Sequence, residues 1–276
     1  MAVNLATKYS PKVDERFTLK SLTEVATNQD YDWDGVSAIK VYSIPTVAMG
    51  AYTRSGLARY GTAAELDDTV ATYTLTRDRA FTFAIDKGNK LDSMNVRDAG
   101  KALSRQTNEV IIPEIDIYRI AALVTAAAAN SGRPTATNIT ASNAYSSFLT
   151  ANAYLDENKV PMGGRVAFVT PTFYNFLKLD PTFLSANEIA QDMKINGQVG
   201  EVDGVPIVKA PSTYFPVKTP FVITHKSALV APKKLQDYKV HDNPPGINGN
   251  LIEGRIIYDA FVLDAKKKAV YAWLEV

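Results

Sequence analysis

Residues 36–85 read VSAIKVYSIPTVAMGAYTRSGLARYGTAAELDDTVATYTLTRDRAFTFAI, and this stretch decides the fold. Two strand-like runs, Val36–Ile44 and Thr72–Ile85, flank an insert over Pro45–Ala71. Hairpin loops usually have about two to five residues, and much longer loops in a compact domain tend to be functional or to need a partner. The stretch therefore predicts a strand pair with an extended loop, and a loop of this kind suggests assembly.

The second run has the alternation of a half-buried strand. Its apolar residues share one parity: Tyr73, Leu75, Phe81, Phe83 and Ile85. Threonines fall mostly on the other parity, and both threonine and aromatic residues favour a pleated surface. The pattern predicts one strand from Thr72 to Ile85.

The insert mixes apolar, basic and acidic side chains that a finger of chain cannot bury on itself. An ordinary surface loop that closes a hairpin is the alternative interpretation. The candidate contact residues on the loop are Tyr52, Arg54, Leu57, Arg59, Tyr60, Glu65, Leu66, Asp67 and Asp68.

Composition restricts the class of protein. The chain has 276 residues and 46% hydrophobic content, enough for one large domain or two modest ones. Lys and Arg total 30 against 29 Asp and Glu, so no net field draws the protein to nucleic acid. There is no cysteine, which excludes disulfides and Cys-ligated metals. No apolar run reaches the length of a membrane span, and Met1–Lys20 lacks the apolar core of a secretory signal.

The rest of the chain predicts an α+β protein. A long helix is expected from a cap at Asp92, Ser93 or Asn95 to Ala129, with a break near Ile112 because Pro113 follows. Further elements are expected as follows: a helix at 141–158, a strand at 165–169, a helix capped by Thr170 and opened by Pro171, a tight hairpin at Asp203–Gly204, and strands at 221–224, 228–231, 255–262 and 269–274.

The search for chemistry gives no catalytic, cofactor-binding or metal-binding residue. The two histidines, His225 and His241, lack the spacing of ligands on one helix face. The glycines fit neither a phosphate loop nor a dinucleotide fingerprint, and no serine lies in a nucleophile elbow. A soluble α/β hydrolase that uses paired carboxylates stays as an alternative, with these candidates: Asp78, Asp86, Glu253 and Asp259.

Five segments in order resemble the major capsid proteins of tailed bacteriophages with the HK97-like fold. They are IKVYSIPTV at 39–47, TLTRDRAFTFAIDKGN at 74–89, RQTNEVIIPEIDIYR at 105–119, RVAFVTPTFYNFLK at 165–178 and EGRIIYDAFVLDAKKKAVYA at 253–272. The resemblance covers nearly the entire chain and rests on the order and spacing of the segments, since none of them is a strict signature.

The resemblance implies a division of the chain. Its parts are an N-terminal arm over 1–35, a strand pair with the extended loop over 36–85, a peripheral domain with a spine helix over 86–133 and 226–276, and an axial domain over 134–225. The loop, at about 45–71, would overlap a neighbouring subunit, and the nine candidate loop residues would make the inter-subunit contacts.

The same resemblance implies function and partners. The chain would form pentamers and hexamers of an icosahedral shell that encloses double-stranded DNA, as part of a virion assembled in the bacterial cytoplasm. A portal, a separate scaffolding protein and a cementing protein are the expected partners, without cofactor or membrane. A separate scaffold is expected because only about 35 residues precede the first strand.

The sequence lacks one feature of some relatives, and one alternative function shares the fold. Some relatives join subunits through a lysine on the extended loop and an asparagine on a neighbour, whereas residues 47–71 contain no lysine. We therefore expect a shell without that cross-link. An encapsulin-like compartment, which shares the fold but encloses proteins, is the nearest alternative.

Overall fold

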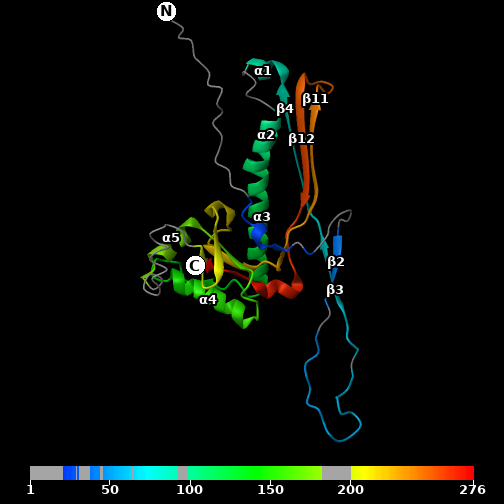
Figure 1. Cartoon of the computed structure of the whole chain (residues 1–276), viewed down its shortest axis with the longest axis vertical. Coiled ribbons are helices and arrows are strands. Elements are labelled where there is room, and N and C mark those ends of the chain that lie inside the picture. Colours follow the sequence, from blue (N-terminus) through cyan, green and yellow to red (C-terminus); the bar gives the residue numbers. More distant parts are fainter. Residues whose placement is uncertain are drawn as a thin grey trace, which may run out of the picture.

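The computed structural model of the chain describes residues 21–28, 30, 38–43, 46–63, 65–92, 99–181 and 200–276. Figure 1 shows three parts around one long helical axis. A narrow sheet lies beside the upper half of the axis, an α/β block lies beside its lower end, and a hairpin extends well beyond both. The mixed helix and strand content confirms the predicted α+β class.

The hairpin is formed by β2 (Ala38–Ser43) and β3 (Thr69–Thr74), which pair antiparallel from Ala38 with Thr74 to Ser43 with Thr69. The next strand, β4 (Arg77–Asp86), belongs to a different sheet. The prediction of a single strand from Thr72 to Ile85 is therefore wrong. The chain changes sheets at Leu75–Thr76, where the backbone N–H of Thr76 donates to a carboxylate oxygen of Asp259 at 2.7 Å.

The predicted alternation along this stretch is confirmed. Tyr73, Leu75, Phe81 and Phe83 are half-buried and Ile85 is buried, whereas their neighbours are exposed. The same parity faces inward in β3 and again in β4 from Phe81 onward, whereas Arg77 and Arg79 at the start of β4 share this parity and are exposed.

The long axis combines α2 (Ala99–Gln106), a π-helical turn over Thr107–Ile111 and α3 (Ile112–Ala129). Figure 1 shows α2 and α3 in line, so the predicted break near Ile112 is wrong. Proline lacks an N–H and crowds the preceding turn, and the wider π turn immediately before Pro113 accommodates both effects without ending the helix. Of the expected caps, Asp92 ends a separate helix α1 (Lys87–Asp92), and Ser93 and Asn95 lie outside the described residues.

The narrow sheet has the strand order β11 (Lys233–Asp242), β12 (Gly249–Tyr258) and β4, all antiparallel. Strand β11 and the first half of β12 were not predicted from the sequence. The sheet packs on the helical axis through a small core that includes Ile111, Ile115, Ile256 and Tyr258. Gly254 allows close packing here, since a Cβ at this position would lie 2.3 Å from the Phe81 ring.

The α/β block is built on a five-stranded sheet. Its order is β14 (Val270–Ala272), β9 (Phe221–His225), β6 (Arg165–Val169), β8 (Val205–Lys209) and β7 (Glu201–Val202). Val166 and Phe168 join the core on the α3 side, and Ala167 and Val169 join the core of α4 (Ala144–Glu157) and α5 (Pro171–Leu179). Every residue of β6 is buried, so this strand separates two cores.

Local predictions in the block are confirmed. The Thr170 side chain accepts a hydrogen bond from the Phe173 N–H at 3.3 Å and caps α5, with Pro171 in the first turn. Asp203 and Gly204 form the turn between β7 and β8 with φ of 50° and 73°, as a tight hairpin requires.

Several short elements complete the fold. They are a 3-10 turn at Glu24–Ala26, β1 (Thr27–Asn28), β5 (Thr135–Ala136), a 3-10 turn at Ser212–Tyr214, β10 (Leu229–Val230), β13 (Phe261–Val262), a 3-10 turn at Asp264–Ala269 and β15 (Leu274–Glu275). Strands β1, β10 and β13 form one sheet, and β15 pairs with β5. The domain division proposed from the sequence remains a prediction, and β14, near the chain end, pairs with β9 inside the α/β block.

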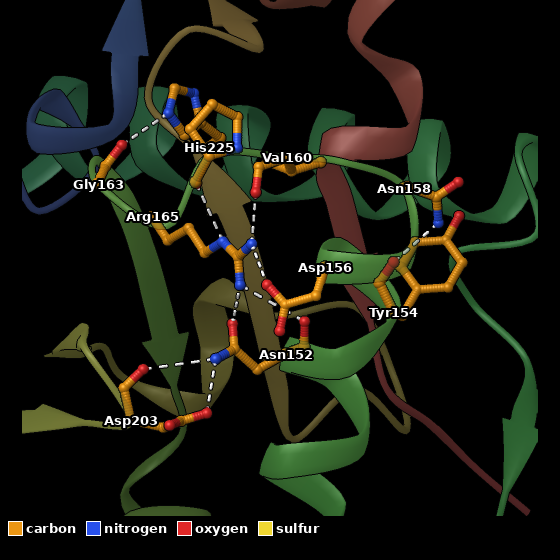
Figure 2. Close-up of polar contacts among 10 residues, drawn as sticks. Asn152, Tyr154, Asp156, Asn158, Val160, Gly163, Arg165, Asp203 and His225 are labelled. Carbon is orange, nitrogen blue, oxygen red and sulfur yellow. Dashed lines mark hydrogen bonds and ion pairs between the residues drawn. The ribbon is translucent and has the colours of Figure 1, made fainter.

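A buried arginine holds one end of the block together. Arg165 begins β6 with a side chain that is 0% exposed. Its nitrogens donate to the following acceptors: the side chains of Asn152 and Asp156 on α4, and the carbonyls of Val160 and Pro161 (Figure 2). Asn152 in turn donates to Asp203 at 2.7 Å. Arg165 thus connects α4, the chain before β6 and the β7–β8 turn.

The first described residues are anchored on α3 in a similar way. Asp116, 1% exposed, accepts hydrogen bonds from the Ser21 hydroxyl at 2.8 Å, the Leu22 N–H at 2.8 Å and the Thr23 hydroxyl at 2.6 Å. Arg119 donates to the Thr23 hydroxyl at 3.0 Å. Burial lowers the pKa of Arg119, and the nearby Asp116 opposes this effect.

Candidate assembly surface

The loop between β2 and β3, called the extended arm here, is described over residues 46–63 and 65–68. Figure 1 shows it extending away from the α/β block, beyond the hairpin strands β2 and β3. All nine residues that sequence analysis selected lie on this arm, and all nine are exposed. The structure describes their position in one subunit, and their contacts with other subunits remain a prediction.

The tip of the arm is a small closed turn. The Thr53 N–H donates to the Arg59 carbonyl at 3.1 Å, and the Arg59 Nε donates to the Gly56 carbonyl at 3.2 Å. Gly56 has φ of 94°, a conformation that side chains with a Cβ rarely adopt. These contacts bring residues 53–59 together, so the tip has its own local order.

Apolar side chains on the arm are open to solvent. Leu57 is 106% exposed and Tyr60 is 91% exposed, and the Tyr60 and Tyr52 rings meet edge to face at 5.1 Å between centroids. Two further exposed apolar residues were not predicted from the sequence: Val47, 76% exposed, and Met49, 101% exposed. Both lie inside the insert identified from the sequence, so their apolar character was the available signal. Exposed apolar groups concentrated on one segment mark an interaction site.

The charged groups of the arm are separated along the loop. Arg54 lies in the tip, whereas Glu65, Asp67 and Asp68 lie on the return towards β3. Within the described ranges, no ion pair joins any of these four side chains to another residue. The arm therefore presents a basic tip and an acidic return to solvent.

The base of the arm, in contrast, is firmly packed. Ile39, Val41, Tyr73 and Leu75 cover a small core that contains Val230 and Leu263. The Asp264 N–H donates to the Tyr73 hydroxyl at 2.9 Å, and the Tyr73 and Phe261 rings lie 5.4 Å apart. A packed base with an exposed tip is the arrangement expected of a segment that reaches another molecule.

The carboxylates of the hydrolase alternative do not form a pair with one another. Asp78 forms an ion pair with Arg255 at 2.5 Å, and the hydrogen bond from Arg255 lowers the pKa of Asp78. Glu253 faces His241 at 3.3 Å. Both pairs lie on the exposed face of the β4–β12–β11 sheet, in the usual arrangement of cross-strand charges.

The remaining candidates have structural partners. Asp86 accepts a hydrogen bond from the backbone of α1, and Asp259 is 2% exposed and bonded to donors. The His225 ring bonds to the Gly163 carbonyl at 2.9 Å and the Ser227 hydroxyl at 2.8 Å. In the part of the chain that the structure describes, no group of three or more His, Cys, Asp or Glu residues could hold a metal ion.

Tyr258 links the narrow sheet to the helical axis. Its hydroxyl donates to Glu114 on α3 at 3.0 Å, and Arg79 on β4 donates to the same carboxylate oxygen at 2.8 Å. Burial raises the pKa of Tyr258 to about 12, and the Glu114 carboxylate acts in the same direction. This contact fixes the sheet against α3.

No described helix is long and apolar enough to cross a membrane.

Comparison with known proteins gives structural matches only. No family model and no curated protein matches the sequence. A capsid structure of the cyanophage P-SCSP1u matches with a TM-score of 0.78 and 14% identity, over 98% of this chain and 93% of that chain. The mature capsid of bacteriophage PhiM1 matches with a TM-score of 0.75 and 13% identity, over 99% of this chain and 92% of that one.

A chain from Mycobacterium phage Che8 matches with a TM-score of 0.72 and 16% identity, over 98% of this chain and 96% of that one. These matches extend over nearly the full length of both partners, which includes the arm, the helical axis and the α/β block. Because the sequence identities are this low, the matches establish the fold alone. The chain therefore has the fold of phage capsid structures, the HK97-like fold that its ordered segments predicted.

Proposed function

We propose that this protein is the major capsid protein of a tailed bacteriophage. In this proposal it is a structural subunit that self-assembles through pentamers and hexamers into an icosahedral shell around double-stranded DNA. The observation that carries the proposal is the extended arm, which holds fully exposed Leu57 and Tyr60 away from the core of its own subunit.

The energetics of the arm support assembly. A Leu or Tyr side chain gains about 1.5–3 kcal/mol when it moves from water to an apolar contact. A single subunit leaves that free energy unused at Leu57, Tyr60 and Met49. In a closed shell every subunit donates an arm and receives one, so a contact of this modest size is repeated throughout the particle.

The charge balance fits the same role. With 30 basic and 29 acidic residues, the subunit has almost no net charge. A strongly basic subunit would bind DNA before the shell closes, whereas packaged DNA is neutralised mainly by small counterions. We propose that DNA is enclosed without sequence-specific contacts, and that a separate scaffolding protein, a portal and a cementing protein complete the virion in the bacterial cytoplasm.

The shell is proposed to be noncovalent. The arm sequence over 47–71 has arginines but no lysine, so the lysine needed for a lysine–asparagine cross-link is missing from this loop. Particles boiled in detergent should therefore run as a monomer band on a denaturing gel. A ladder of covalent multimers from native particles would contradict this part of the proposal.

The test is to express the full chain alone and with candidate scaffolding proteins, and to examine it by size-exclusion chromatography and negative-stain electron microscopy. Closed shells, tubes, or rings of five and six subunits are expected. Double-stranded DNA inside native particles is expected as well, and protein cargo instead would favour a compartment shell. A monomer that persists with scaffold and crowding agents would overturn the proposal.

A further inference from the structure

A buried carboxylate lies at the point where the arm joins the rest of the subunit. Asp259 is 2% exposed and lies between β12 and β13. One of its oxygens accepts hydrogen bonds from the Thr76 N–H at 2.7 Å and the Thr76 hydroxyl at 2.9 Å. The other oxygen accepts from the Tyr118 hydroxyl at 2.7 Å and the Ala260 N–H at 2.8 Å. Each oxygen of the Asp259 carboxylate thus accepts two hydrogen bonds.

The contacts of Asp259 connect the start of β4 to α3. Tyr118 lies on α3, and the guanidinium of Arg77 lies 4.5 Å from the centroid of its ring. Thr76 and Arg77 are consecutive, so the chain at the start of β4 is held from two sides by the same tyrosine and carboxylate. Burial raises the pKa of Tyr118, and the hydrogen bond to Asp259 raises it further, which keeps the hydroxyl protonated as a donor.

These contacts lie at the junction between the arm and the narrow sheet. Thr76 lies between β3, at the base of the arm, and β4, which belongs to the narrow sheet. Neither Leu75 nor Thr76 is in a strand, so their backbone angles, together with the packing of Tyr73 and Leu75 on the core of Val230 and Leu263, set the angle between the arm and the narrow sheet. The β-sheet ladders stop at this junction, and the hydrogen bonds to Asp259 replace them.

We infer that Asp259 is a positioning residue that sets the direction of the extended arm relative to α3, by holding Thr76 and Tyr118 on the two oxygens of one carboxylate. The value of that direction for shell assembly rests on the proposed function. The direction itself is a property of one subunit and can be measured without assembly, so a failure of either idea can be distinguished from a failure of the other.

The direction of the arm can be measured between two spin labels. The chain has no cysteine, so Ala58→Cys on the arm and Ala128→Cys at the end of α3 supply unique labelling sites, and both positions are exposed. Pulsed dipolar spectroscopy on dilute, unassembled subunits should give one narrow distance distribution. With Asp259→Ala added, the distribution should broaden and shift, because the junction loses the hydrogen bonds that define it.

Amide hydrogen exchange gives a second readout at the junction. In Asp259→Ala the Thr76 amide loses a hydrogen bond to a charged acceptor, so it should exchange about tenfold faster. Tyr118→Phe keeps the ring and removes only its hydroxyl, so it should broaden the distance distribution while the subunit stays folded. This variant keeps the inference testable if Asp259→Ala does not fold.

Asp116→Ala is the matched control. Asp116 is 1% exposed, and its carboxylate also accepts several hydrogen bonds, but its partners are Ser21, Leu22 and Thr23 and not the arm. This variant should lower the unfolding temperature and leave the arm distance unchanged. The inference would be overturned if Asp259→Ala and Tyr118→Phe lowered stability but kept the narrow distribution, or if Asp116→Ala broadened it equally.

Discussion

Replacement of Leu57 by serine should weaken assembly without weakening the subunit. The side chain is 106% exposed, so it makes no stabilising contact in its own subunit. Burial of a leucine against a neighbour is worth about 2 kcal/mol. Since about 1.4 kcal/mol corresponds to a factor of ten, Leu57→Ser should raise the subunit concentration needed for assembly about 30-fold. The free energy of unfolding should change by less than about 0.5 kcal/mol, as at most surface positions.

The assay is a concentration series in which assembled and free subunits are separated by size-exclusion chromatography. The plateau of free subunit gives the threshold for assembly, and urea unfolding of free subunit gives the stability. Val217→Ser is the control, since Val217 is 84% exposed but lies in the α/β block and not on the arm.

Tyr60→Ser, at 91% exposure, should act in the same direction as Leu57→Ser, and the double variant should abolish assembly at accessible concentrations. An unchanged threshold in both single variants would refute the argument. So would an equal rise of the threshold with Val217→Ser, because the effect would then not belong to the arm.

Three further predictions concern stability and are measured by urea unfolding. Arg165→Met should lower the free energy of unfolding by about 3–5 kcal/mol, because buried acceptors lose their donor. Asp156→Asn should lower it by less than about 1 kcal/mol, because the Asp156 side chain is 53% exposed. Similar losses for the two variants would contradict the network in Figure 2. Gly254→Ala should cost about 1–3 kcal/mol through the clash with the Phe81 ring, and a neutral result would refute it. The pKa of Tyr258 is raised, so the unfolded chain loses this proton near pH 10 and the folded chain near pH 12. The free energy of unfolding of the wild type should therefore fall by about 2–3 kcal/mol relative to Tyr258→Phe across that pH range. Parallel curves of unfolding free energy against pH for the two proteins would disprove the shift.

Local signals predicted much of the fold because they depend on neighbours in sequence. The Thr170 cap, the Asp203–Gly204 turn and the alternation of Tyr73, Leu75 and Phe81 act within a few residues, and the structure confirms each of them. What failed depends on distant partners. At the break between β3 and β4, Thr76 bonds to Asp259, which lies 183 positions away.

The helical axis shows a failure of a different kind. Pro113 normally interrupts a helix, and only the surrounding packing decides whether the interruption is a kink, an end or a π turn. Here Ile111 and Ile115 both belong to the small core that contains Ile256 and Tyr258 of the narrow sheet, so one core holds the helix on both sides of the proline. Strand β11 was missed for a related reason, since its charged residues Lys233, Asp237 and Lys239 leave few apolar positions from which a strand could be recognised.

The candidate site could be located from the sequence but not divided into its working parts. Length and composition were enough to identify the arm, because both are properties of the segment alone. They could not show that the Arg59 side chain is occupied inside the tip while Leu57 and Met49 are free, since this depends on the turn around Gly56. Exposure in the folded chain therefore reorders the candidates, with Leu57, Tyr60 and Met49 ahead of Arg59.

The contrast between the base and the tip of the arm explains how one segment can be both ordered and available. A two-stranded ribbon is marginally stable alone in water, so β2 and β3 depend on the core beneath Tyr73 and Leu75. An arm fixed at its base loses less conformational freedom on contact with a neighbour than a free loop would, so more of the apolar burial at Leu57 appears as binding free energy. The same arm with a loose junction would keep every exposed side chain and still bind more weakly. Asp259, which is buried and does not lie on the arm, is for this reason as relevant to the arm as the residues at its tip.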